Sequence, residues 1–258
     1  MLKLFRGSAT PKQPEPPAAA PSGAPGAEGH ATGCLVCGKP LAYLAASEPM
    51  ACALCGKSCV SAARCTAGHF VCDACHATPA KELIEKVCAA TDEKDPIAIA
   101  LRILAHPAVK LHGPEHHFLV PAVLVAAYSN AKGEGAKRAE RVAEARKRSE
   151  PILGGFCGLQ GACGAAIGTG TFVAIVTSSS PLKGKERGLA NRMTARALTV
   201  VASTDAARCC KRDSMLSILA AVKFANEHLG ARMTSHGAAC AWSGVNQECA
   251  GGACPFNR

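Results

Sequence analysis

The chain has 258 residues and is 48% hydrophobic, which is enough for a substantial folded core. Only 4% of the residues are aromatic while small residues are abundant, so we expect closely packed helices rather than a large sheet. A formal net charge of +10 would suit an anionic partner such as a nucleic acid. The basic N-terminus lacks the apolar run of a signal peptide, which predicts a cytoplasmic protein whose 16 cysteines are reduced thiols.

Two regions precede the expected helices. Residues 1–33 are rich in Pro, Ala, Gly and Ser and have little to bury, so they are predicted to be a disordered leader. Residues 34–77 carry C-x2-C pairs, each of which places two thiolates on one side of a tight turn. This region is predicted to be a zinc-binding module with the ligands Cys34, Cys37, Cys52, Cys55, Cys65, His69, Cys72 and Cys75.

The order of these ligands resembles a RING-type or treble-clef finger, in which alternate pairs share a metal. The resemblance implies two zinc ions, one held by Cys52, Cys55, Cys72 and Cys75 and the other by Cys34, Cys37, Cys65 and His69. Sequential pairing is the alternative, and Cys59 or His76 could replace one of the expected ligands. Iron bound as in rubredoxin is the redox variant of the same geometry. One C-x2-C pair precedes the run where a RING has one following it, so ubiquitin-ligase function is not implied.

Residues 78–258 are predicted to form a helical domain, which makes the chain mostly α. Thr78 and Pro79 are expected to start its first helix, and Asp95 and Pro96 carry the same signature for the second. Further helices are expected over residues 113–130, 133–150, 185–204 and 213–230. The helix at 133–150 is strongly basic, and its charges either form a solvated face or contact an acidic partner or RNA.

The stretch LHGPEHHFLVPA, residues 111–122, places three imidazoles and a carboxylate at a helix start. Glu115, His116 and His117 fall in the first turn, where free backbone amides favour an anionic ligand or a thiolate-rich cluster. His112 lies outside the helix and can fold back as a further cofactor-binding residue. We therefore expect a metal or redox site here, and a polar helix start without chemistry is the alternative.

The segment between residues 150 and 183 is uncharged but interrupted by glycines, which predicts buried helices rather than a membrane span. Its glycines would let the backbone around Cys157 and Cys163 approach a ligand closely. Further along, Cys209 and Cys210 are adjacent, and a disulfide between neighbours is strained, so they are expected to serve a metal or redox site. Their basic neighbours are expected to lower the thiol pKa values.

The C-terminal tail is predicted to be irregular and holds three more cysteines. Cys240, Cys249 and Cys254 are expected to form a further partial cofactor-binding site or a lid. Cys88, by contrast, falls within a predicted helix and is expected to be a core residue.

The stretch GACGAAIG, residues 161–168, is similar to the central motif of the small helical redox family known by its C-GCAxxG-C-C signature. In that family an earlier helix supplies one cysteine and two later cysteines complete the set. Here His117 stands at the place of the early cysteine, and Cys209 and Cys210 match the later pair. The resemblance implies that these residues act with Cys163, and the exchange of Cys for His leaves the metal or cluster type open.

From Cys34 onward the chain also resembles an uncharacterised cysteine-rich domain family of anaerobic bacteria and archaea, through its HGPEHH, GACGAA, RCCKR and CPF motifs. This implies an anaerobic metal or redox setting, with radical-SAM or methyltransferase proteins as partners.

We therefore expect a metal-binding protein with a zinc module and a second site, holding an iron–sulfur cluster or another transition metal, for electron transfer or thiol redox chemistry. A zinc-finger adaptor for nucleic acid or protein is the alternative. A hydrolase with a histidine base is disfavoured, because no nucleophile or phosphate-binding motif accompanies it.

Overall fold

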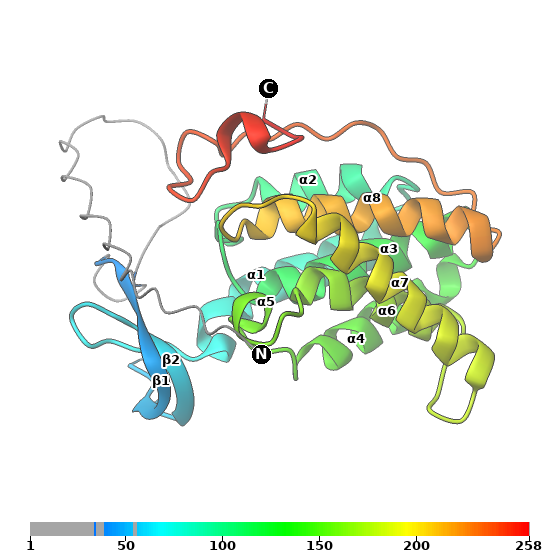
Figure 1. The fold of residues 1–258 in the computed structure, drawn as a ribbon. Coiled ribbons are helices and arrows are strands. Elements are labelled where there is room, and N and C mark those ends of the chain that lie inside the picture. Colours follow the sequence, from blue (N-terminus) through cyan, green and yellow to red (C-terminus); the bar gives the residue numbers. More distant parts are fainter. Residues whose placement is uncertain (1–33, 35–38, 54–55, 258) are drawn as a thin grey trace, which may run out of the picture.

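The computed structural model describes residues 34, 39–53 and 56–257. The expected leader, residues 1–33, and the expected ligands Cys37 and Cys55 lie outside these ranges, as does the side chain of Cys75. Figure 1 shows a two-stranded hairpin at one end of the molecule, followed by a bundle of helices and an irregular tail. The strands are β1 (Leu41–Ala51) and β2 (Ser58–Cys65), and the helices are α1 (Asp73–Ala90), α2 (Pro96–Leu104), α3 (Glu115–Ala131), α4 (Arg138–Ser149), α5 (Phe156–Leu159), α6 (Gly164–Val176), α7 (Gly184–Ala202) and α8 (Cys210–His228).

The hairpin strands pair in antiparallel fashion, with Leu41 opposite Cys65 and Ala51 opposite Ser58. The register shifts between Tyr43 and Glu48, so the strand is irregular near its middle. Both strands are largely exposed, and their contacts are mainly with each other. A hairpin of this kind buries too little apolar surface to be stable alone, so its ends need another source of stability.

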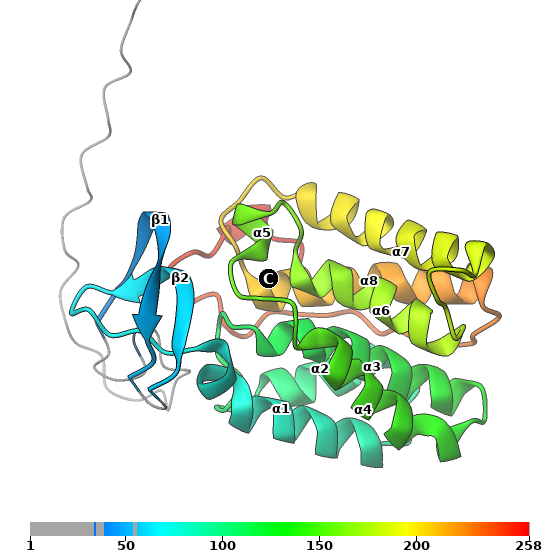
Figure 2. The same ribbon diagram turned by 90° about the horizontal axis from the view of Figure 1, so that it is seen from below.

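The predicted mostly helical fold is confirmed, and α3 forms its centre. The helix is buried around its whole circumference from Phe118 to Ser129, and it contacts α1, α2, α4, α6 and α8. Figure 2 shows α3 between the layer that contains α1 and α4 and the layer that contains α6, α7 and α8. The apolar run that follows the HGPEHH motif is therefore the core of the domain, as a helix hydrophobic on all sides requires.

Two glycines let α6 approach its neighbours closely. A Cβ added at Gly168 would lie 2.7 Å from Pro121 Cδ in α3, and one at Gly170 would lie 1.9 Å from Thr194 Oγ1 in α7. Because no side chain fits at these distances, both positions require glycine. The prediction of buried helices in the uncharged segment is thus right for α6 but wrong for α5, none of whose residues is buried. No described helix is long and apolar enough to span a membrane.

The start of α1 differs from the prediction. The helix begins at Asp73, five residues before the expected cap at Thr78, and Pro79 lies in its interior. Cys72 precedes the first turn with an extended backbone, so the last C-x2-C pair leads directly into the helix. The expected start of α2 is confirmed, since Asp95 Oδ1 accepts hydrogen bonds from the backbone N–H groups of Ile97 and Ala98.

The tail after α8 runs back along the bundle toward the start of that helix (Figure 1). Two contacts hold its first part. The side chain of Asn226 bonds the N–H and the carbonyl of Met233, and Asp95 Oδ2 accepts a 2.7 Å bond from the N–H of His236. Further along the tail, the N–H of Cys240 donates a hydrogen bond to the carbonyl of Phe256, so residues 240–256 form a closed loop. This path brings the last three cysteines over the beginning of α8.

Candidate metal centres

The first candidate centre lies beside the hairpin. Donor atoms of Cys34, Cys65 and His69 all lie within 4.8 Å of one another, and both cysteines are buried. His69 Nδ1 is 3.6 Å from Cys65 Sγ, and the backbone N–H of His69 donates to the same sulfur at 3.2 Å. Two thiolates and an imidazole are ligands that zinc prefers. The group can therefore hold a metal ion, and it joins the segment that enters the hairpin to the segment that leaves it, at the open end of the hairpin.

These three residues belong to one of the two ligand sets that the resemblance to a treble-clef finger implies. The fourth member of this set, Cys37, lies outside the described residues. Of the other set, Cys52 and Cys72 are buried and adjacent, since the N–H of Cys72 donates to Cys52 Sγ at 3.3 Å. Cys59, an expected substitute, instead pairs with Met50 in the hairpin ladder.

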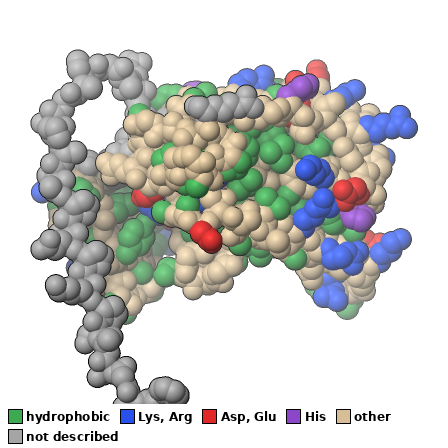
Figure 3. Space-filling model, turned by 45° about the horizontal axis from the view of Figure 1, so that its top comes forward, with side chains coloured by type: hydrophobic (Ala, Val, Ile, Leu, Met, Phe, Trp, Pro, Cys, Tyr) green, Lys and Arg blue, Asp and Glu red, His purple; other side chains and the backbone are tan. Residues whose placement is uncertain are grey.

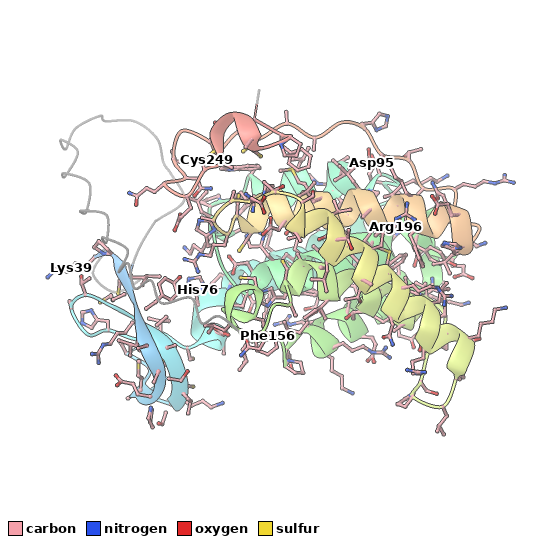
Figure 4. All side chains as sticks on the ribbon, viewed as in Figure 1. Lys39, His76, Asp95, Phe156, Arg196 and Cys249 are labelled. Atoms are coloured by element: carbon pink, nitrogen blue, oxygen red, sulfur yellow. The ribbon has the colours of Figure 1, made fainter. Side chains whose placement is uncertain are left out.

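A second group of thiols surrounds a cavity at the start of α8, which we call the four-thiol cavity. Cys209 directly precedes α8, and Cys240, Cys249 and Cys254 come from the tail. Figure 4 shows Cys249 where the tail passes the beginning of the helix. The cavity has a free volume of about 20 Å³, which is room for about one water-sized group and excludes an organic cofactor.

Three of the four sulfurs accept hydrogen bonds from nitrogen. The backbone N–H of Trp242 donates to Cys240 Sγ at 3.3 Å, and that of Gly251 donates to Cys249 Sγ at 3.4 Å. Cys209 Sγ accepts from the N–H of Arg212 and from Asn246 Nδ2, each at 3.5 Å. Donors placed around sulfur stabilise thiolates and tune the clusters that thiolates bind.

The spacing of these sulfurs distinguishes between a single ion and a larger group. Four sulfurs around one tetrahedral zinc at about 2.3 Å would lie roughly 3.8 Å from each other. No three sulfurs of the four-thiol cavity, all of which the structure describes, lie within 4.8 Å of one another, whereas Cys34, Cys65 and His69 do. As they stand, the sulfurs of the four-thiol cavity are therefore not gathered closely enough to be the ligand set of one tetrahedral ion.

Two buried cations adjoin the four-thiol cavity. Lys211 is 1% exposed, and its Nζ lies 4.3 Å from the centre of the Trp242 ring and donates to the carbonyl of Leu104. Arg212 Nε donates to Asp213 Oδ1 at 2.9 Å, but its buried Nη1 has no hydrogen-bond partner within the described part of the chain. Burying a cation is costly without compensating negative charge. Asp213 supplies this charge for Arg212, and cavity thiolates would supply it for Lys211.

The thiol pKa values differ from the expectation. Burial raises the pKa of Cys209 despite the nearby Arg212, and burial also raises the pKa of Cys210. The prediction that the flanking basic residues lower these thiol pKa values is therefore wrong, because the loss of solvation on burial outweighs the attraction between the cations and the thiolates.

The three histidines of the HGPEHH motif point to three different places. His116 is buried and hydrogen-bonds the carbonyl of Lys110 and the hydroxyl of Ser214 through its two ring nitrogens, and burial holds its pKa well below the usual range. His117 Nδ1 donates to the carbonyl of Ile152 at 3.0 Å. His112 Nε2 lies 3.1 Å from Asn246 Oδ1 and 3.0 Å from Glu248 Oε2, in the tail.

His117 nonetheless lies where the resemblance to the redox family places it, against the start of α6. A Cβ at Gly164 would be 2.2 Å from His117 Cδ2, and Cys163 directly precedes that glycine. The glycine of the GACGAA motif therefore makes room for the imidazole. His116 has no such neighbour, so the two adjacent histidines do not serve one site.

Glu115 is fully buried at the junction between α3 and α1. Its Oε1 accepts a hydrogen bond from the N–H of Lys110 at 2.9 Å. Its Oε2 lies 3.8 Å from His76 Nδ1, and neither Oε2 nor His76 Nδ1 has a hydrogen-bond partner among the described residues. Burial raises the pKa of Glu115 to about 7. The group links the cysteine-rich end of α1 to the helical domain.

The remaining predicted thiols lie apart from the four-thiol cavity. Cys157 and Cys163 line a neighbouring cleft, and burial raises the pKa of Cys163 to about 11. Cys210 is close enough to Cys163 and Glu115 to interact with them electrostatically, but it lines neither the four-thiol cavity nor the neighbouring cleft. Cys88 is in the core, as expected. The structure therefore places Cys209 in the four-thiol cavity, whereas Cys163 lines the neighbouring cleft and lies near Cys210.

Several residues of the four-thiol cavity were not predicted. Trp242 and Asn246 line it without having been predicted, and Lys211 was expected only, with the other basic neighbours of Cys209 and Cys210, to lower the thiol pKa values. The grouping of Cys240, Cys249 and Cys254 near a Trp and an Asn was the available signal, because polar and aromatic residues between closely spaced cysteines are common around thiolate-bound groups.

Comparison with known proteins gives one match. No curated protein and no solved structure matches the chain. A family model described as a family of unknown function (DUF5714) matches residues 84–257, which include the HGPEHH motif, α8 and the entire tail with its cysteines. The match covers more than half of the sequence, and the chain therefore belongs to the DUF5714 family of unknown function.

Proposed function

We propose that the protein is an electron-transfer or thiol-redox metalloprotein, in which a zinc-binding module is joined to a helical domain that holds an iron–sulfur cluster. One observation carries the proposal. Cys209, Cys240, Cys249 and Cys254 surround a single compact cavity at the start of α8. Four cysteine thiolates are the usual ligands of such clusters.

The surroundings of the four-thiol cavity support a cluster. Such a cluster, when bound, supplies reversible one-electron chemistry. The chain itself would hold it through the four sulfurs, orient Cys209 through Asn246, and offset its negative charge with Lys211 and Arg212. Trp242, which is 8% exposed, limits the access of water. Buried cations and hydrogen bonds to sulfur favour the reduced, more negative state, so they raise the reduction potential.

In the N-terminal module, we propose that Cys34, Cys37, Cys65 and His69 hold one zinc ion, and that Cys52, Cys55, Cys72 and Cys75 hold a second. The described geometry of Cys34, Cys65 and His69 supports the first. A closed four-ligand zinc site has no open position for substrate, so this module has a structural role.

The charge distribution favours this function over a nucleic-acid adaptor. At the end of the bundle away from the hairpin, Lys and Arg side chains are mixed with acidic side chains and His (Figure 3). The cations of the basic helix α4, on another face, are largely paired as well, in the pairs Arg138–Asp92, Arg141–Glu134, Arg146–Glu85 and Arg148–Glu144. A charged face that is already paired is typical of a solvated surface. The partner is proposed to be a redox protein, for example of the radical-SAM or methyltransferase class.

The test is metal and sulfide analysis of anaerobically prepared full-length protein, together with visible absorption and EPR spectra. We expect iron and sulfide in equal amounts, visible absorbance, and an EPR signal on reduction. Cys240→Ser and Cys249→Ser should each lose most of the iron and the absorbance. Cys88→Ala removes a thiol from the core and should retain both. Protein that contains only zinc, or iron content unchanged in both serine variants, would contradict the proposal.

A further inference from the structure

Next to the four-thiol cavity the molecule has a second, more open hollow, which we call the α7 cleft. It has a volume of about 360 Å³, in the range of sites for small organic molecules. Its walls are the segment around α5, the C-terminal end of α7, and the loop that leads into α8. Figure 2 shows α5 beside the beginning of α8, and Figure 4 marks α5 by Phe156.

The two sides of the α7 cleft differ in chemistry. The end of α7 contributes the apolar side chains Leu198, Val201 and Ala202. The loop before α8 and the first turn of that helix contribute two cations, Arg208 and Arg212. An apolar surface facing a few convergent charged groups is typical of a site that binds a molecule with a charged head and a carbon skeleton.

We propose that the α7 cleft binds a small organic acid, whose carboxylate contacts Arg208 and Arg212 and whose carbon skeleton packs on the end of α7. Guanidinium groups bind carboxylates through charge-assisted hydrogen bonds in a planar geometry.

The charges of the wall select a monoanion. Asp213 also lines the cleft and accepts a 2.9 Å hydrogen bond from Arg212 Nε, so one of the two cationic charges is already compensated. Arg212 is 3% exposed, and its Nη1 is buried without a hydrogen-bond partner in the described chain. The remaining charge matches one carboxylate, whereas a doubly charged phosphate would exceed it.

Arg208 is held in position but keeps donors free. Its guanidinium carbon lies 5.3 Å from the centre of the Tyr43 ring, which comes from the hairpin. Its nearest carboxylate, Glu248, is at 4.0 Å, and both side chains are about one-third or more exposed. Such a long, exposed pair contributes little, so the guanidinium is available to a ligand.

Arg212 and the chain around it connect the α7 cleft to the four-thiol cavity. Arg212 lines both hollows, and Arg208 directly precedes the cavity cysteine Cys209. An acid bound in the cleft would thus lie beside the cluster, as a substrate or an effector of the electron-transfer site. This link rests on the proposed function, whereas binding of the acid does not.

The experiment is calorimetric titration of the anaerobically prepared full-length protein with phenylacetate, its neutral analogue phenylacetamide, and phenyl phosphate. We expect phenylacetate to bind at least about tenfold more tightly than the amide, because a charge-assisted hydrogen bond is lost with the carboxylate. Equal binding of the acid and the amide, or tighter binding of phenyl phosphate, would overturn the inference.

Variants localise the binding. Arg208→Gln should weaken phenylacetate binding about tenfold, and Ala202→Phe should abolish it by filling the cleft from the exposed end of α7. Arg196→Gln is the matched control for the Arg-to-Gln exchange. Arg196 lies on α7, as Ala202 does, but it pairs with Glu227 and does not line the cleft (Figure 4). Unchanged binding in both cleft variants would overturn the assignment of the site.

The same samples separate the two proposals. If phenylacetate binds and shifts the EPR signal of the cluster, both the acid site and the proposed function are supported. Binding to protein that contains zinc but no iron supports the acid site and contradicts the proposed function. A cluster without binding of the acid contradicts this inference alone.

Discussion

At the scale of single residues, Glu115 is the clearest source of pH dependence. Burial raises its pKa from 4.5 to about 7, so the folded protein holds this proton more tightly than the unfolded chain. The resulting stabilisation is complete below pH 4.5 and is lost as the pH rises to 7. Above that, the buried carboxylate destabilises the fold.

We predict that Glu115→Gln stabilises the protein relative to wild type, and that the gain grows with pH through this window. Gln can still accept the N–H of Lys110, and the gain should reach about 3 kcal/mol. Urea unfolding across the window measures it. Glu140→Gln, at an exposed position on α4, controls for loss of a charge. A stability difference independent of pH would contradict the raised pKa.

Asp95 is a residue whose carboxylate holds two segments at once. One oxygen caps α2, and the other accepts from the backbone N–H and the Nδ1 of His236 in the tail. Asp95→Ala should lower the free energy of unfolding by roughly 2 kcal/mol or more. Asp95→Asn keeps one acceptor and should lose less. Chemical denaturation measures both, and equal losses would show that the cap contributes nothing of its own.

At the scale of elements, contact between α6 and α7 depends on the absence of a side chain at Gly170. Gly170→Ala would place a Cβ against Thr194 Oγ1 and 3.0 Å from the carbonyl of Ala190. We expect a loss of about 1–3 kcal/mol from overpacking, measured by thermal or urea unfolding.

The second variant Thr194→Ala tests the cause of that loss. It removes the closest atom, so the double variant should recover part of the stability. Gly184→Ala is the control, because a Cβ there meets nothing within 4 Å. Strictly additive effects of the two substitutions would mean that the clash is not the cause.

At the scale of the whole molecule, the hairpin and the helical bundle should respond differently to metal removal. The strands contact mainly each other, while the bundle has its own core around α3. A chelator, or Cys65→Ser, should therefore unfold the hairpin and leave the far-UV circular dichroism of the helices nearly unchanged. NMR signals of Met50 and Val60 would report the hairpin. Simultaneous loss of helical signal would show that the bundle depends on the metal.

The sequence by itself determined the helical class, the position of α2 through Asp95, the buried α3 after HGPEHH, and the proximity of His117 to the GACGAA motif. The first three follow from local rules, since caps and apolar runs act within one helix, whereas the proximity of His117 to the GACGAA motif was implied by the resemblance to the redox family. It also predicted thiol pairs in the N-terminal module. It placed the start of α1 too late, because Thr78 and Pro79 carry a start signal that the chain passes through as a helix interior.

Only the tertiary structure decided which thiols share a site. Cys209 joins Cys240, Cys249 and Cys254 and not Cys163, because the tail returns along the bundle, held by Asp95 and Asn226. That return depends on contacts between residues distant in sequence, which no local pattern encodes. The same applies to the charges. Lys211 and Arg212 resemble surface residues in the sequence, but the packing of the tail over α8 buries them, and burial raises the pKa of the neighbouring thiols instead of lowering it.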